Sequence, residues 1–218
     1  MVPGVDWGTV DNRWDTAWTE SFSDGVFAFA ITLLVVDIQV PESAFNHLWR
    51  GIADQWPSYL GYATSFLTVG GIWLAHHGIF RRLQYANRRV MHVNLALLMA
   101  VAFLPFPTRL VAEAIRDASA ERAAVIFYGT WLLVISLVFS ALWGAVASDR
   151  SLLKPEVSEN EVNAIARATT PNLGFYLGVI VLAFIAPKVA AFGYLVIAIV
   201  AVLRARGDSG TPTTPESA

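Results

Sequence analysis

Long apolar runs dominate this sequence. They extend over about 18 to 25 residues each, and a helix of that length, rising 1.5 Å per residue, crosses the roughly 30 Å of hydrocarbon in a bilayer. The composition agrees, because 56% of the residues are hydrophobic and only 15% are charged, against roughly 25% charged in an average soluble domain. The sequence therefore predicts an all-α, polytopic membrane protein.

We predict one transmembrane domain over residues 1–206, with six spans. The expected spans are approximately 22–40, 57–79, 91–111, 123–147, 172–186 and 189–205. Pro187 separates the last two, which form either a tight hairpin or one long kinked helix. We expect Pro105-Phe-Pro107 to end the third span. Residues 207–218 have the composition of a disordered tail.

The basic residues predict the orientation, because flanking Lys and Arg are retained on the cytoplasmic side of a membrane. With the N-terminus inside, ten of the fifteen Lys and Arg residues fall in cytoplasmic segments. The pairs Arg81-Arg82 and Arg88-Arg89 contribute most, since they flank the short loop between the second and third spans. We therefore expect both termini, including the tail, to be cytoplasmic.

Several function classes are excluded. The net charge is −2 and the basic residues are scattered, so no nucleic-acid partner is expected. The chain has no cysteine, which removes disulfides, thiolate metal sites and cysteine nucleophiles. Adjacent His76-His77 point about 100° apart on a helix and predict no metal site. Neither a catalytic triad pattern nor a phosphate loop is present, so an enzyme is disfavoured. Channel, secondary transporter and membrane scaffold remain, and we expect no cofactor.

The first span carries polar groups inside an apolar run, where they are costly unless they are used or satisfied. On a helical wheel, one stripe within about 100° holds five residues, and these are Gly25, Phe29, Thr32, Leu33 and Val36. Asp24 falls about 140° from Phe29. We predict that the stripe lines an ion pathway and that Asp24 faces back into the bundle.

Asp24 has two interpretations. Trp73 and His77 share a face of the second span, and Asn94 lies about one turn into the third, so all are at a similar depth. They form the first hypothesis, an intrasubunit polar network of Ser23, Asp24, Trp73, His77 and Asn94. The second is an N-terminal helix cap, because Ser21-x-x-Asp24 is similar to a capping box.

Together, these motifs resemble one known family. The segment Phe22-Ser-Asp-Gly-Val-Phe-Ala-Phe-Ala-Ile-Thr-Leu-Leu-Val-Val-Asp-Ile, Trp73-x-x-x-His77, Asn94 and Leu104-Pro-Phe-Pro-Thr108 are similar to those of the transmembrane protein 175 family, the lysosomal and prokaryotic potassium channels. The likeness covers residues 20 to 110 strongly and the remainder by hydropathy. The combination of motifs is specific.

The resemblance implies a six-span subunit that forms a homotetramer in a bacterial cell membrane, with the first helix of each subunit around a central pore. Phe29 would then form the constriction, Thr32 would contribute to selectivity, and Leu33 and Val36 would add apolar layers. The partners expected are other copies of the chain and membrane lipids. The family motif usually has Arg at the position of Trp18, and Ile or Leu at that of Phe29.

The function expected is a potassium-permeable cation channel with a hydrophobic constriction on the first transmembrane helix. Potassium ions would pass as permeant ions, shedding part of their water at the neck, which can close by dewetting. The alternative is a proton-leak channel or proton-coupled transporter that uses Asp24 and His77, since histidine titrates near neutral pH.

Overall fold

The computed structural model describes residues 14–115, 117, 119–162 and 171–207, and every regular element in them is helical. The long helices are α1 (Thr16–Val36), α3 (Trp56–Arg82), α4 (Arg88–Phe103), α5 (Pro105–Ala114), α6 (Glu121–Ala147), α8 (Pro171–Ile185) and α9 (Pro187–Gly207). The short ones are η1 (Glu42–His47), α2 (Leu48–Ala53) and η2 (Arg150–Leu152). The expected tail lies outside the described residues, apart from Gly207 at the end of α9.

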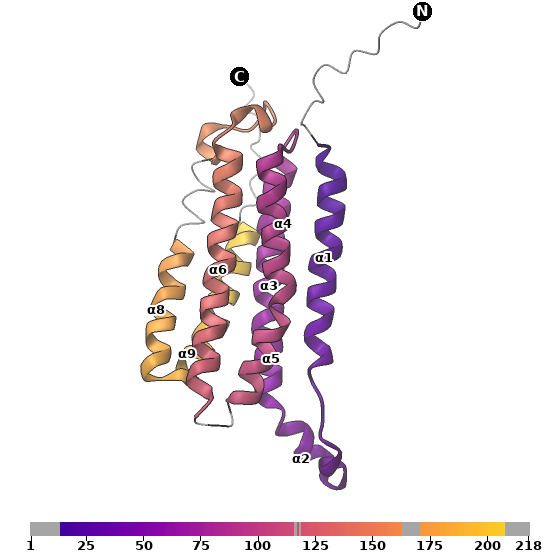
Figure 1. The fold of residues 1–218 in the computed structure, drawn as a ribbon, viewed down its shortest axis with the longest axis vertical. Coiled ribbons are helices and arrows are strands. Elements are labelled where there is room, and N and C mark those ends of the chain that lie inside the picture. The colour runs from indigo at the N-terminus through magenta and orange to yellow at the C-terminus, as the bar shows by residue number, and fades with distance from the viewer. Residues whose placement is uncertain (1–13, 116, 118, 163–170, 208–218) are drawn as a thin grey trace, which may run out of the picture.

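The helices form an elongated bundle (Figure 1). Three helical segments are long and apolar enough to cross a membrane: Thr16–Val36, Arg88–Ala114 and Glu121–Ala147. Shorter apolar helices cover Leu173–Ile185 and Pro187–Leu203. Every predicted span has a helix over most of its length, although α1 begins six residues before the predicted start at Phe22. This shift places Trp18 inside the helix instead of before it.

Prolines punctuate two of the helical segments. α4 ends at Phe103, as expected before Pro105-Phe-Pro107, but Pro105 also begins α5, because proline fits the first turn of a helix. The third predicted span is therefore broken at Leu104 but not terminated there. Pro187 begins α9, and α9 packs along α8. The hairpin interpretation of the last two segments is the one that the structure contains.

The bundle core is formed by α3, α4, α6 and α9, whose buried side chains include Val69, Leu97, Leu132 and Tyr194. Gly129 on α6 allows close approach of α9, because a Cβ there would collide with the ring of Tyr194. In contrast, a Cβ at Gly174 or Gly178 would meet nothing within 4 Å inside the subunit. The predicted small-residue packing face of α8 therefore has no partner helix in the described part of the chain.

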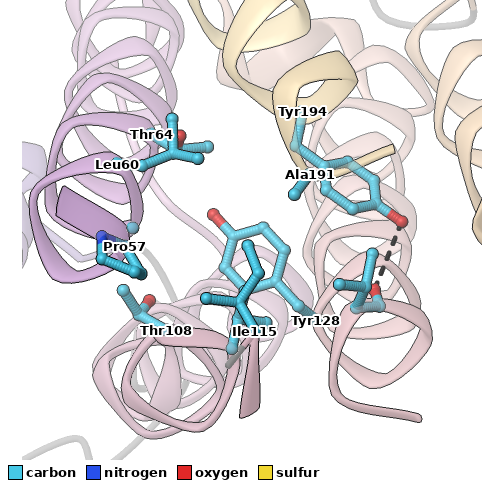
Figure 2. Close-up of a pocket in the computed structure, with 11 residues that line it drawn as sticks. Pro57, Leu60, Thr64, Thr108, Ile115, Tyr128, Ala191 and Tyr194 are labelled. Atoms are coloured by element: carbon cyan, nitrogen blue, oxygen red, sulfur yellow. Dashed lines mark hydrogen bonds between the residues drawn. The ribbon is translucent and has the colours of Figure 1, made fainter. Parts of the chain in front are cut away.

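A polar cluster joins α3, α5 and α6 at the end of the bundle that carries α2. The Ser65 hydroxyl lies 2.7 Å from Thr108 Oγ1 and 2.9 Å from Tyr128 Oη. Thr108 donates its own hydrogen to the Leu104 carbonyl at 2.8 Å, so Ser65 donates to Thr108 and Tyr128 donates to Ser65. A cavity of about 20 Å³ lies beside this cluster, between α3, α5, α6 and α9 (Figure 2). The chain of donors fixes the break at Leu104.

α1 lies at the edge of the bundle (Figure 1) and packs against α3 and α4 on one side. Its N-terminal end is held by a pair of backbone hydrogen bonds, in which Trp14 N–H donates to the Ala86 carbonyl at 2.8 Å and Ala86 N–H donates to the Trp14 carbonyl at 3.0 Å. The loop between α3 and α4 thus positions the start of α1. The opposite face of α1 has no neighbour in the described part of the chain.

Candidate functional site: the exposed face and the polar contacts of helix α1

α1 starts on a side-chain cap. Asp15 Oδ1 accepts a hydrogen bond from Ala17 N–H at 2.8 Å, which satisfies one of the free donors at a helix N-terminus. The interpretation of Asp24 as the cap is therefore wrong, because Asp24 lies more than two turns into the helix. It failed because the polar segment before Phe22 is itself helical.

The exposed face of α1 is the predicted stripe. Phe29 is 64% exposed and Val36 is 60% exposed, and Gly25 and Thr32 are exposed beside them. Leu33 is half-buried, so it lies at the border of the stripe. The stripe also continues toward the N-terminus through Phe22 and Trp18, which were not assigned to it from the sequence. The buried face of α1 carries Thr19, Ser23, Phe27, Ala30 and Leu34.

Thr32 is the polar group in the middle of this stripe. Its hydroxyl donates a hydrogen bond of 2.8 Å to the Phe29 carbonyl, one turn back on the same helix. The hydrogen is therefore engaged with the backbone, and the oxygen keeps its remaining lone-pair capacity for an acceptor role. Thr32 presents an oxygen ligand, and not a donor, to anything that occupies the space along the stripe.

Asp24 faces α3 instead of the stripe. Its Oδ1 accepts a hydrogen bond of 2.7 Å from the Trp73 indole Nε1–H, and the pair is part-buried. The structure thus brings together Asp24 and Trp73, as the network hypothesis required. A carboxylate in apolar surroundings needs such a donor.

A second, fully buried chain links α1, α4 and α3. Asn94 Nδ2 donates to Ser23 Oγ at 3.1 Å, and Ser23 donates to the Thr19 carbonyl at 2.7 Å. Asn94 Oδ1 lies 2.8 Å from His76 Nε2. Because that oxygen only accepts, His76 carries its hydrogen on Nε2 and donates to Asn94. His76 and Asn94 are 0% and 1% exposed, so this chain is sealed from solvent.

His76 was therefore missed as a network member, and His77 occupies a different place. His77 Nδ1 lies 2.5 Å from Glu20 Oε1, and its ring stacks on Trp73 with a centroid distance of 5.9 Å. The sequence reasoning chose His77 because it shares a face with Trp73. The signal for His76 was its spacing from Phe80, four residues on, against which it stacks at 4.4 Å in the core.

The predicted network is thus two sets of contacts, one running from Ser23 through Asn94 to His76 and the other joining Glu20 to His77 and Asp24 to Trp73. Both hold the N-terminal half of α1 against α3 and α4. Within the described residues, no group of three or more His, Asp or Glu side chains is arranged to hold a metal ion.

The apolar spanning helices and the anchored edge helix define a class, the polytopic α-helical membrane proteins. Comparisons with known proteins narrow it. The family model described as endosomal/lysosomal potassium channel TMEM175 matches residues 19–105. A protein of Chamaesiphon minutus named as a potassium channel is 38% identical over 87% of this chain and 95% of its own length. The chain therefore belongs to the TMEM175 family, a family of ion channels and not of enzymes.

A solved structure and a vertebrate relative extend this result. The crystal structure of a lysosomal potassium-selective channel TMEM175 homolog from Chamaesiphon minutus matches with a TM-score of 0.79 and 37% sequence identity, over 87% of this chain and 97% of that one. A protein of Danio rerio named endosomal/lysosomal proton channel TMEM175 is 35% identical over 63% of this chain, which corresponds to 28% of its own length.

Proposed function

We propose that this chain is the subunit of a homotetrameric, potassium-permeable cation channel in which four copies of α1 surround a central pore. Phe29, Leu33 and Val36 form the hydrophobic constriction, and Thr32 contributes to selectivity. The channel resides in the cell membrane as a six-span protein, with both termini and the loop of Arg81 to Arg89 in the cytoplasm. The partners are three further copies and the surrounding lipid.

The observation that carries this proposal is the uncovered face of α1. A helix at the edge of a subunit, anchored on one side by buried polar contacts, exposes Phe29 and Val36 at 64% and 60%. Within the same stripe, Gly25 leaves room for close approach, since a Cβ there would meet nothing within 4 Å. The names of the Chamaesiphon relative and of its solved homolog, both potassium channels, support the same function.

The mechanism follows from the chemistry of the stripe. Apolar side chains around a narrow axis offer an ion no replacement for its water, so the neck conducts when hydrated and closes by dewetting. The four Thr32 oxygens, each with its hydrogen directed to the Phe29 carbonyl, coordinate the cation where its hydration shell is thinnest. Without a ring of carbonyl oxygens, the selectivity for potassium over sodium is modest.

The polar contacts behind α1 have a structural part in this mechanism. Ser23, Asp24 and Glu20 all face α3 or α4, and each meets a polar partner there. A gate of four facing side chains works only if each helix keeps its rotation about its own axis. The contacts hold that rotation, so that Phe29 and Val36 face the pore axis and the Asp24 carboxylate stays away from it.

Potassium flux into liposomes tests the proposal. Purified protein is reconstituted into vesicles loaded with potassium chloride, and the efflux is followed with a potassium-selective electrode. We expect Phe29→Ala to increase the efflux, because it widens the constriction. Phe184→Ala is the matched control, since Phe184 is 58% exposed on α8 and lies off the proposed pore. Unchanged efflux from folded Phe29→Ala tetramers would refute the assignment of the gate.

The second candidate is a proton-conducting channel or a proton-coupled carrier. The name of the Danio rerio relative favours it, and Asp24 and His77 were the relay expected from the sequence. In the structure, Asp24 contacts Trp73 and His77 contacts Glu20, behind the stripe. Reversal potentials under separate potassium and proton gradients distinguish the two. A potential that follows the proton gradient alone contradicts the potassium assignment.

A further inference from the structure

A groove of about 470 Å³ lies between the N-terminal parts of α1 and α4. Its walls are Trp14, Trp18 and Phe22 from the α1 side, and Met91 and Leu95 from α4. This volume is within the range of sites for small organic molecules, about 300 to 1,000 Å³.

The aromatic walls are accessible. Trp18 is 81% exposed, and Phe22 and Trp14 are also exposed. Trp18 takes the position at which the resembled family motif has arginine, so this chain has an indole there instead of a fixed positive charge. Indole and phenyl faces attract cations through their quadrupole, most strongly for tryptophan, and recognise quaternary ammonium groups.

The charge in the groove has a single sign. Among the described residues that line it, Asp15 is the only charged one. Its Oδ1 accepts the cap hydrogen bond from Ala17 N–H, and its second carboxylate oxygen has no hydrogen bond to the described part of the chain. The two other polar residues are already engaged, since Thr19 donates to the Asp15 carbonyl or Met91 sulfur, and Asn94 bonds to Ser23 and His76.

We propose that this groove is a binding site for bulky organic cations of the quaternary ammonium type. The alkyl arms pack on Phe22, Met91 and Leu95, while the cationic centre lies against the Trp18 ring within the field of the Asp15 carboxylate. Anionic ligands and lipid phosphates find no basic partner in the lining.

The position of the groove gives the site a consequence for conduction, which rests on the proposed function. Trp18 and Phe22 belong to both the groove and the exposed stripe of α1. In the proposed tetramer, a cation bound there lies at the cytoplasmic mouth of the pore, two to three turns before Phe29. Its bulk and charge then impede potassium entering from that side.

Binding is measured by isothermal titration calorimetry of the full chain in detergent with tetrabutylammonium. Tributylphosphine oxide, which has similar bulk and no net charge, is the comparison ligand. We expect Trp18→Leu to weaken tetrabutylammonium binding roughly 3- to 30-fold, the range that one cation–π contact accounts for. Trp18→Phe should retain part of the affinity, because it keeps an aromatic face.

Two further variants separate the contributions. Asp15→Asn should weaken the cation several-fold while α1 keeps its cap, since asparagine caps helices as well as aspartate does. Trp49→Leu is the matched control, because Trp49 is 86% exposed on α2, far from the groove along the chain axis, and its affinity should equal that of the parent. Equal binding of the neutral phosphine oxide, or parental affinity in Trp18→Leu, would overturn the proposal and indicate a general apolar groove.

The failure of this site and the failure of the channel have different readouts. Calorimetry reports binding whether or not the protein conducts. Potassium efflux without tetrabutylammonium tests the channel alone. If the parent conducts and tetrabutylammonium inhibits it from the cytoplasmic side, Trp18→Leu should raise the inhibitory concentration by the same factor as the dissociation constant. A change in one without the other would contradict the location at the pore mouth.

Discussion

The buried chain from Ser23 through Asn94 to His76 makes a sharp prediction about stability. Asn94→Leu keeps the approximate volume of the side chain but removes both of its hydrogen bonds, to Ser23 Oγ at 3.1 Å and from His76 Nε2 at 2.8 Å. Ser23 remains satisfied, because it donates to the Thr19 carbonyl. His76 does not, since it is 0% exposed and loses the acceptor of its ring hydrogen.

The cost is therefore mainly that of one orphaned donor. An unsatisfied buried polar group costs about 1 to 3 kcal/mol, whereas a hydrogen bond between membrane helices contributes only about 0.6 kcal/mol on average. We expect Asn94→Leu to lower the free energy of unfolding by about 1 to 3 kcal/mol. The measurement is unfolding in mixed micelles titrated with sodium dodecyl sulfate, followed by circular dichroism.

The second variant makes the reasoning refutable. His76 stacks on Phe80 at 4.4 Å and meets Phe27 edge-on at 5.3 Å, so a phenyl ring suits its surroundings. Adding His76→Phe to Asn94→Leu removes the orphaned donor and should recover most of the lost stability, because replacing both partners with apolar groups is nearly neutral. If the double variant is instead less stable than Asn94→Leu alone, by the full cost of His76→Phe, the orphaned donor is not the cause.

Three further predictions concern other parts of the molecule. Thr32→Val should lower the potassium-to-sodium permeability ratio a few-fold, measured from bi-ionic reversal potentials; an unchanged ratio would remove Thr32 from the selectivity assignment. Gly129→Leu should destabilise the bundle by about 1 to 3 kcal/mol through overpacking against Tyr194, whereas Gly174→Leu, on open space, should leave the unfolding midpoint within error. His77→Ala and Glu20→Gln should alter conduction to a similar extent if they act as a pair; independent, additive effects would contradict that.

Much of the architecture was predictable because hydrocarbon imposes a simple rule. A chain in a membrane must pair its backbone groups internally and keep apolar side chains outward, so run length alone locates helices. The stripe of Gly25, Phe29, Thr32 and Val36 followed from helical periodicity, since a period of 3.6 residues assigns faces without knowledge of neighbours. The break before Pro105 likewise follows from the missing amide hydrogen of proline.

Other features depended on which helices meet, and the local sequence does not determine that. His76 and His77 are adjacent and chemically identical, and only the packing of α3 against α4 directs His76 to Asn94, while α1 brings Glu20 to His77. Trp18 appeared to lie before the first span, because the preceding segment is polar, yet Asp15 caps a helix that begins at Thr16. Hydrophobicity thus determined the helices and their faces, whereas the polar partners and the groove beside Trp18 arise from contacts between segments distant in the chain, which only the tertiary structure decides.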